Sequence, residues 1–176
     1  MSISYAGIGS RQTPINVLNL MKQLAEVLAI KGETLRSGAA DGADAAFEAG
    51  CLHAGGQAEI YLPWPGFNGH KSPLAYPHPD AFTLAARFHP AWNQCKQGAR
   101  ALHARNCHQV LGRNLDDPVS KVICWTPNGS GSGGTGQALR LAKHLNIPIY
   151  DLGNPIVAND AQIEVATFLF NRSQQP

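Results

Sequence analysis

Residues 7–11, Gly-Ile-Gly-Ser-Arg, have the side chains and spacing to bind a phosphate group. The hydroxyl of Ser10 and the guanidinium of Arg11 stand beside backbone N–H groups, and this combination favours an anionic ligand. The Gly-x-Gly pair is half of a dinucleotide-binding fingerprint, because the third glycine is missing. A tight turn after a strand would use the same glycines, and Arg11 could equally be a solvated loop charge.

Residues 129–136, Gly-Ser-Gly-Ser-Gly-Gly-Thr-Gly, form a second candidate phosphate-binding turn. The segment lies between an apolar run and a helical pattern, so its N–H groups and the following helix start could cradle an anion. It is not a Walker loop, since no Gly-Lys-Ser/Thr follows. A flexible linker is the alternative, but the position between a strand and a helix favours the binding turn.

Residues 37–44, Ser-Gly-Ala-Ala-Asp-Gly-Ala-Asp, carry no bulky side chain, so a ligand could approach their backbone closely. Asp41 and Asp44 stand at a helix start, where one carboxylate would cap free N–H groups and the other could contact a ribose hydroxyl. Neither has the partner of a general acid–base pair. The catalytic residue is therefore unknown, with Asp44 and Glu48 as candidates.

The sequence predicts no metal site and no cofactor. His103 and Cys107 are four residues apart and could share a metal, but no third ligand is in sight. The cysteines are widely spaced and form no Cys-x-x-Cys, so we expect buried free thiols at all four positions, which are Cys51, Cys95, Cys107 and Cys124.

Hydrophobic patterning predicts the elements that must position these segments. Short apolar runs predict strands at 3–8, 34–36, 58–62, 119–125 and 147–150. Helical patterns follow them at about 14–31, 43–54, 80–88, 91–111, 135–145 and 159–171, and residues 63–80 are expected to form an ordered loop. Strands that alternate with helices predict a Rossmann-like, doubly wound α/β fold with a mainly parallel five-stranded sheet and helices on both faces.

In such sheets a ligand lies beyond the carboxyl ends of the strands, where the direction of the connections reverses. The candidate segments all follow predicted strands, so we expect them to line one pocket. Trp64 could stack a base, and Arg105-Asn106 would reach the pocket from a helix. The predicted ligand-binding residues are Gly9, Ser10, Arg11, Ser37, Gly38, Ala39, Asp41, Asp44, Trp64, Arg105, Asn106, Thr126, Gly133, Gly134 and Thr135.

Composition limits the size of the protein and its partners. The 176 residues suit a single domain, with a core at about 3–153 and a helical tail at 154–176. The chain shows no long apolar run and no signal peptide, so we expect a cytoplasmic protein with no membrane partner. A net charge of +2 and 15% charged residues suit one small anionic ligand better than a long polyanion. Much of the glycine, at positions 7, 9, 38, 42 and 129–136, would then line a backbone-walled pocket.

The ordered motifs resemble the SLOG superfamily, the Rossmann-like group that contains DprA (Smf), the YspA/YpsA-like proteins and the LOG phosphoribohydrolases. Residues 37–44 resemble the Ser-Gly-Gly-Ala-x-Gly-x-Asp signature of DprA and YspA-like proteins, and Arg105-Asn106 matches an Arg-Asn pair near the family's ligand pocket. Gly133-Gly134-Thr135 resembles the phosphate-binding turn. The resemblance covers about residues 3–153, and the short form looks like the stand-alone versions found in phages.

The resemblance implies a nucleotide or nucleotide-derived ligand and leaves three functions open. The chain could bind such a ligand without chemistry, which we favour, or bind single-stranded DNA as DprA does. DNA binding would require several cations to cluster, namely Arg11, Lys71, Arg87, Lys96, Arg100 and Arg113. A LOG-like N-glycosidic hydrolase or transferase is the third option, but Ala138 replaces the family's glutamate. Family members often dimerise, so a homo-oligomer is also expected.

Overall fold

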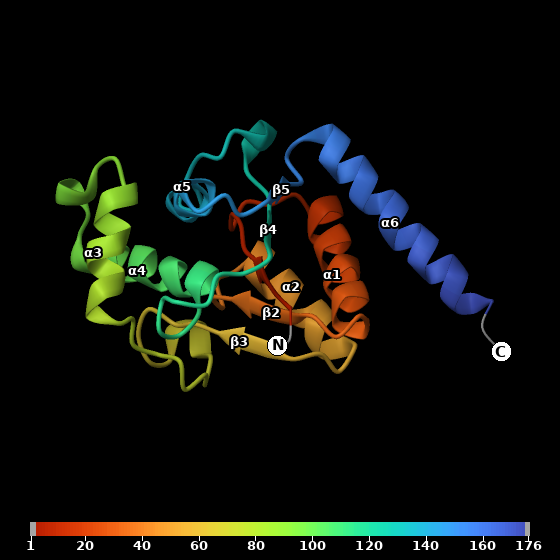
Figure 1. Ribbon diagram of the computed structural model, residues 1–176, viewed down its shortest axis with the longest axis horizontal. Coiled ribbons are helices and arrows are strands. Elements are labelled where there is room, and N and C mark those ends of the chain that lie inside the picture. The colour runs from red at the N-terminus through yellow and green to blue at the C-terminus, as the bar shows by residue number, and fades with distance from the viewer. Residues whose placement is uncertain (1–2, 175–176) are drawn as a thin grey trace.

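Residues 3–174 are described by a computed structural model of the chain (Figure 1). Its single sheet has five parallel strands in the order β3-β2-β1-β4-β5. Their bounds are β1 (Ser4–Gly7), β2 (Thr34–Ser37), β3 (Ala58–Ile60), β4 (Lys121–Cys124) and β5 (Ile149–Asp151). All five predicted strands are confirmed, and so is the doubly wound Rossmann-like fold; the sheet is parallel throughout.

Helices cover both faces of the sheet (Figure 1). One layer holds α1 (Ile15–Ile30), α2 (Ala43–His53) and α6 (Pro155–Ser173), and the other holds α3 (Pro79–Phe88), α4 (Gln97–Leu111) and α5 (Gly136–His144). Each layer buries its own apolar cluster. Neighbouring residues of β1 supply both clusters, because Tyr5 points to the first layer and Ala6 to the second.

The long helix predicted at 91–111 is wrong at its start. Residues 92–94 form a 3₁₀ turn, η2 (Trp92–Gln94), and Cys95 and Lys96 are extended before α4 begins at Gln97. Pro90 disfavours helical geometry at His89, so α3 ends there and the chain crosses irregularly to α4. Lys96 offers no capping side chain, so the sequence carries no start signal at the true boundary.

The loop predicted at 63–80 is confirmed as far as the start of α3 at Pro79, and it contains one 3₁₀ turn, η1 (Phe67–Gly69). Beyond β5, the predicted tail helix is α6, which packs along α1. Asn154 caps it by accepting the Ile156 N–H at 3.0 Å, and Lys31 pairs with Glu164 at 2.8 Å. Within residues 3–174, no helix combines the length and apolarity needed to cross a bilayer.

Candidate functional site

The chain direction reverses between β1 and β4, the central neighbours of the sheet. From β1 the chain winds through β2 to β3, whereas β4 leads to β5 on the opposite side. The carboxyl ends of these two strands therefore carry loops that diverge, and the space between diverging loops is where open α/β sheets bind ligands. Residues 8–14 form the first of these loops and residues 125–135 the second.

The β1–α1 loop is built on close backbone contacts that exclude side chains. A Cβ atom on Gly9 would lie 2.6 Å from the Cβ of Ala43. Gly42 has a φ of +81°, and its Cβ would lie 2.7 Å from the Ser10 carbonyl. These two glycines let the β1–α1 loop rest on the start of α2. The exposed Arg11 then follows, and its guanidinium has no partner among the described residues.

The β4–α5 loop is fixed at its base by Asp151, which the sequence analysis missed. The buried carboxylate accepts the Thr126 N–H at 2.9 Å, the Gly153 N–H at 3.0 Å and the Thr126 hydroxyl. Thr126 Oγ1 in turn accepts the Gly131 N–H at 2.8 Å. Thr126, predicted to touch a ligand, is buried here and supports the loop. The sequence signal that could have indicated this role is an acidic residue directly at the end of the fifth predicted strand.

Beyond this base the glycine-rich segment presents its backbone to solvent. Gly129, Gly131 and Gly133 all have positive φ, which bends the loop outward before α5. Gly133 and Gly134 are exposed, and within residues 3–174 no acceptor faces their N–H groups or that of Thr135. Asn106 of α4 donates its side-chain N–H to the Gly134 carbonyl at 3.3 Å. The loop is therefore tethered to α4 while its donors stay free.

The β2–α2 segment is buried rather than open. The Ser37 hydroxyl donates to the Gly7 carbonyl at 2.7 Å, which ties β2 to β1. A Cβ atom on Gly38 would lie only 1.3 Å from Arg105 Nη1, so this glycine makes room for the guanidinium. Ala39 is also buried and adopts a φ of +55°. All three predicted ligand contacts are therefore buried in contacts within the protein.

Asp44 and Arg105 form a buried ion pair that joins α2 to α4. Arg105 Nη1 lies 3.1 Å from Asp44 Oδ2, and each side chain is about 95% shielded from solvent. Burial raises the pKa of the Asp44 carboxyl, and the Arg105 guanidinium opposes that rise. With its amide oxygen facing Gly38, Gln109 accepts from the Gly38 N–H and from Arg105, both at 3.0 Å. The pair thus holds the β2–α2 segment against α4.

The remaining predicted residues lie apart from one another. Glu48 is engaged by His70, whose Nε2 lies 2.7 Å from the carboxylate. Asp41 is exposed at the start of α2. Trp64 follows β3 at the sheet edge, and its ring packs edge-on against Phe67 at 5.2 Å. The two loops at the switch point therefore carry residues 9–11 and residues 133–135, and Asn106 is bonded to the second loop, whereas Trp64 lies in the loop after β3.

The five parallel strands and the reversal of chain direction between β1 and β4 define a Rossmann-like α/β fold, as the sequence predicted. No family model matches the sequence, and no curated protein matches it significantly. The chain is, however, similar in structure to several proteins whose structures have been solved.

The chain is similar to the Moco carrier protein of Chlamydomonas reinhardtii, with a TM-score of 0.57, 15% identity, and 99% of this chain and 97% of that one covered. It is also similar to DNA processing protein A from Helicobacter pylori, which binds single-stranded DNA (TM-score 0.57, 18% identity, 96% and 81% covered). The structural-genomics target TM1055 superimposes with a TM-score of 0.52 at 18% identity, over 85% and 72% of the two chains. At these identities the likeness establishes the fold alone.

Proposed function

We propose that the protein binds a nucleotide or a nucleotide-derived anion across the switch point between β1 and β4. The observation that carries this proposal is the set of uncommitted donors there. The N–H groups of Gly133, Gly134 and Thr135 face no acceptor within the described chain, and they precede α5, whose N-terminus carries a partial positive charge. Arg11 adds an unpaired guanidinium on the neighbouring loop.

The buried parts of the site support binding by keeping these donors in place. Asp151 fixes the base of one loop, and Gly9 and Gly42 fix the other against α2. A preorganised set of donors loses little conformational entropy when an anion binds. The low net charge fits this arrangement, since backbone N–H groups supply most of the attraction.

Calorimetric titration with AMP, GMP, NAD and inorganic phosphate tests the proposal. We expect at least one nucleotide to bind more tightly than phosphate, because a base and a sugar add contacts beyond the anion. Arg11→Gln should weaken that binding about tenfold or more, the value of one charge-assisted hydrogen bond.

Arg172→Gln is the matched control, because Arg172 is exposed near the end of α6. Its titration should match the unmodified chain. Equal nucleotide affinity in the Arg11 variant, or no binding by any probe at millimolar concentration, would overturn the proposal.

Single-stranded DNA is a second candidate ligand, favoured by one surface hollow between α3 and α4. Phe82, Arg87, Trp92 and Arg100 all line it. The Arg100 guanidinium carbon lies 5.4 Å from the Trp92 ring centre. Aromatic faces beside cations suit stacked bases and their phosphates. The likeness to the Helicobacter protein, which binds single-stranded DNA, adds a reason to test this face.

The hydrolase alternative gains no support from the geometry of its two candidate carboxylates. Asp44 is buried against Arg105, and Glu48 is held by His70. Ala138, at the position of the LOG glutamate, is fully buried in α5. A carboxylate that is buried and paired is poorly placed to reach a glycosidic bond. Ligand binding without chemistry is therefore the function that the site supports best.

A further inference from the structure

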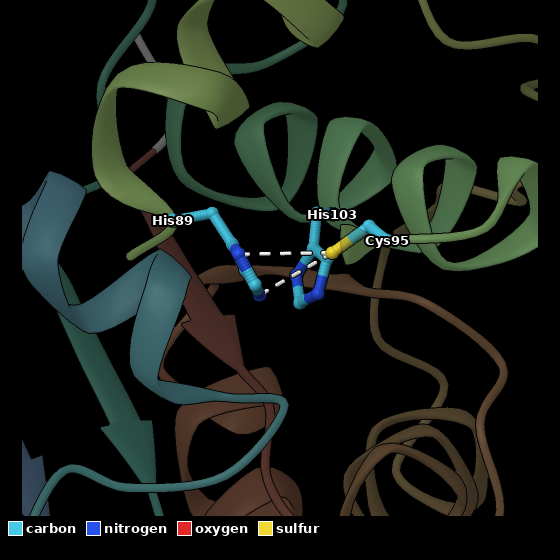
Figure 2. A group of neighbouring side chains, drawn as sticks. All are labelled: His89, Cys95 and His103. Atoms are coloured by element: carbon cyan, nitrogen blue, oxygen red, sulfur yellow. Dashed lines mark hydrogen bonds between the residues drawn. The ribbon is translucent and has the colours of Figure 1, made fainter. Parts of the chain in front are cut away.

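Three side chains that bind transition metals meet where α3 gives way to α4. His89 follows α3, Cys95 follows the η2 turn, and His103 lies in α4 (Figure 2). One ligand atom from each lies within 4.8 Å of the others. Cys95 Sγ is 3.7 Å from His89 Nδ1 and 3.8 Å from its Nε2, and the two imidazole ring centres are 4.3 Å apart.

These separations nearly match a zinc site. Bond lengths of about 2.3 Å to sulfur and 2.0–2.1 Å to nitrogen place tetrahedral ligand atoms roughly 3.4–3.6 Å apart. The sulfur and the His89 nitrogens already lie close to that spacing, so small side-chain rotations would complete it. Figure 2 shows the three side chains turned towards one another, with dashed lines from the His89 ring nitrogens to the Cys95 sulfur.

A polar atom of the cluster is also left without a partner. His103 Nδ1 is shielded from solvent, and no hydrogen-bond partner for it exists among the described residues. Such an atom carries a desolvation cost that a ligand can remove. Burial, His89 and Arg140 lower the pKa of His103 to about 4, so its ring is neutral at pH 7. The positive charge of Arg140 would also disfavour a bound metal ion, and the negative charge of the Cys95 thiolate would offset this repulsion.

We propose that His89, Cys95 and His103 form a binding site for Zn²⁺, with the fourth coordination position left to water or to an exogenous ligand. Three protein ligands with one open position are typical of zinc centres that act on a bound molecule, whereas structural centres are closed by four. Coordination replaces the thiol proton of Cys95, so uptake of the ion releases a proton. The irregular 89–96 segment would then serve to place Cys95 beside the two histidines, because a continuous helix from residue 91 would not bring its thiol there. The inference goes beyond the proposed ligand site and does not depend on it.

Titration of the reduced, chelator-treated chain with Zn²⁺ tests this site. We expect one ion per chain, with the proton release visible as a dependence of binding enthalpy on buffer. Cys95→Ser and His103→Gln should each weaken binding about 100-fold or more, since even residues that only support a metal ligand are worth 10–100-fold. Co²⁺ should give a thiolate-to-cobalt charge-transfer band that Cys95→Ser abolishes.

Two controls separate the site from adventitious binding. Cys51→Ser removes a buried thiol elsewhere and keeps a donor for the Gln57 carbonyl, and His53→Gln removes an exposed imidazole. Both should bind Zn²⁺ as the unmodified chain does. Circular dichroism of each variant checks that it is folded. Absent Zn²⁺ uptake at 1:1, or equal uptake by folded Cys95→Ser, would overturn the proposal.

Discussion

Burial decides what Asp44 and Arg105 can do. The resemblance places both residues at a ligand pocket, yet the two side chains face each other inside the protein. The opposite charge of the partner is the largest effect that offsets the desolvation of each residue, so the pair forms one unit. Gly38 is part of the same unit, because any larger residue would occupy the place of the guanidinium. These residues would therefore affect ligand binding at the switch point only indirectly, through the backbone segments that they hold in position.

We predict that Arg105→Met destabilises the protein by about 3–5 kcal/mol, because it leaves Asp44 buried and unpaired. Urea denaturation measures the loss. The double variant Arg105→Met/Asp44→Asn should lose less than the sum of the two single changes, since it removes both charges. Arg113→Met, at an exposed position just after α4, is the control. A loss below about 1 kcal/mol in Arg105→Met would contradict the prediction.

The element that depends most on one side chain is the β4–α5 loop. Asp151 reaches it from β5 and accepts three hydrogen bonds, two from Thr126 and one from Gly153. The ends of neighbouring strands are thus joined by this carboxylate in addition to the backbone bond from the Leu152 N–H to the Cys124 carbonyl. The exposed glycines can remain open to an anion because the base beneath them is fixed.

We predict that Asp151→Asn loosens this loop, because an amide N–H would stand where Oδ2 accepts the Thr126 hydroxyl and would disturb the hydroxyl that holds the Gly131 N–H. Hydrogen exchange should show faster exchange at the Thr126, Gly131 and Gly153 amides, by about tenfold or more. Amides in α1, which packs on the other side of the sheet, should keep their protection. Asp160→Asn, exposed on α6, is the control. Unchanged exchange at the loop amides would show that the carboxylate is dispensable.

Elements could be predicted from the sequence where local signals were strong. Apolar runs ended by glycine or proline located the five strands, and the helical pattern predicted from residue 14 lies within one residue of the start of α1. The start of α4 could not be predicted, because its cap is a lysine without a capping hydrogen bond. The cysteine expectation holds for Cys51, Cys107 and Cys124, which are buried free thiols, and fails for Cys95, which is partly exposed.

The site was harder to predict because its contacts join distant segments. Arg105 meets Asp44 across 61 positions, and Thr126 meets Asp151 across 25. Spacing along the chain carries no signal of either pair. His103 was seen as one half of an i, i+4 pair with Cys107, whereas its true neighbours come from the irregular segment before α4. Local sequence patterns therefore predicted where the loops lie along the chain. They could not predict which side chains of those loops are buried, because burial depends on contacts between distant segments.

At the scale of the whole molecule, cationic side chains are few, and some of them are not free to bind an anion because they already pair with carboxylates. Four of the 14 lysines and arginines pair with carboxylates, which are Lys31, Arg36, Arg105 and Lys121. Of the six cations that DNA binding would require to cluster, only Arg87 and Arg100 line the hollow between α3 and α4, with Lys96 one turn before Arg100. The molecule thus has a small basic face rather than a broad basic field.

This charge distribution predicts how single-stranded DNA would bind, if it binds at the α3–α4 face. Three cations neutralise about three phosphates, so the logarithm of affinity should fall against the logarithm of salt with a slope of about −2. Fluorescence anisotropy of a labelled oligothymidine measures it. Arg87→Gln/Arg100→Gln should flatten the slope to about −0.7, the value for one remaining cation. Arg11→Gln should leave the slope unchanged, because Arg11 lies at the switch point. The opposite pattern, a slope that responds to Arg11 alone, would assign the DNA phosphates to the nucleotide site.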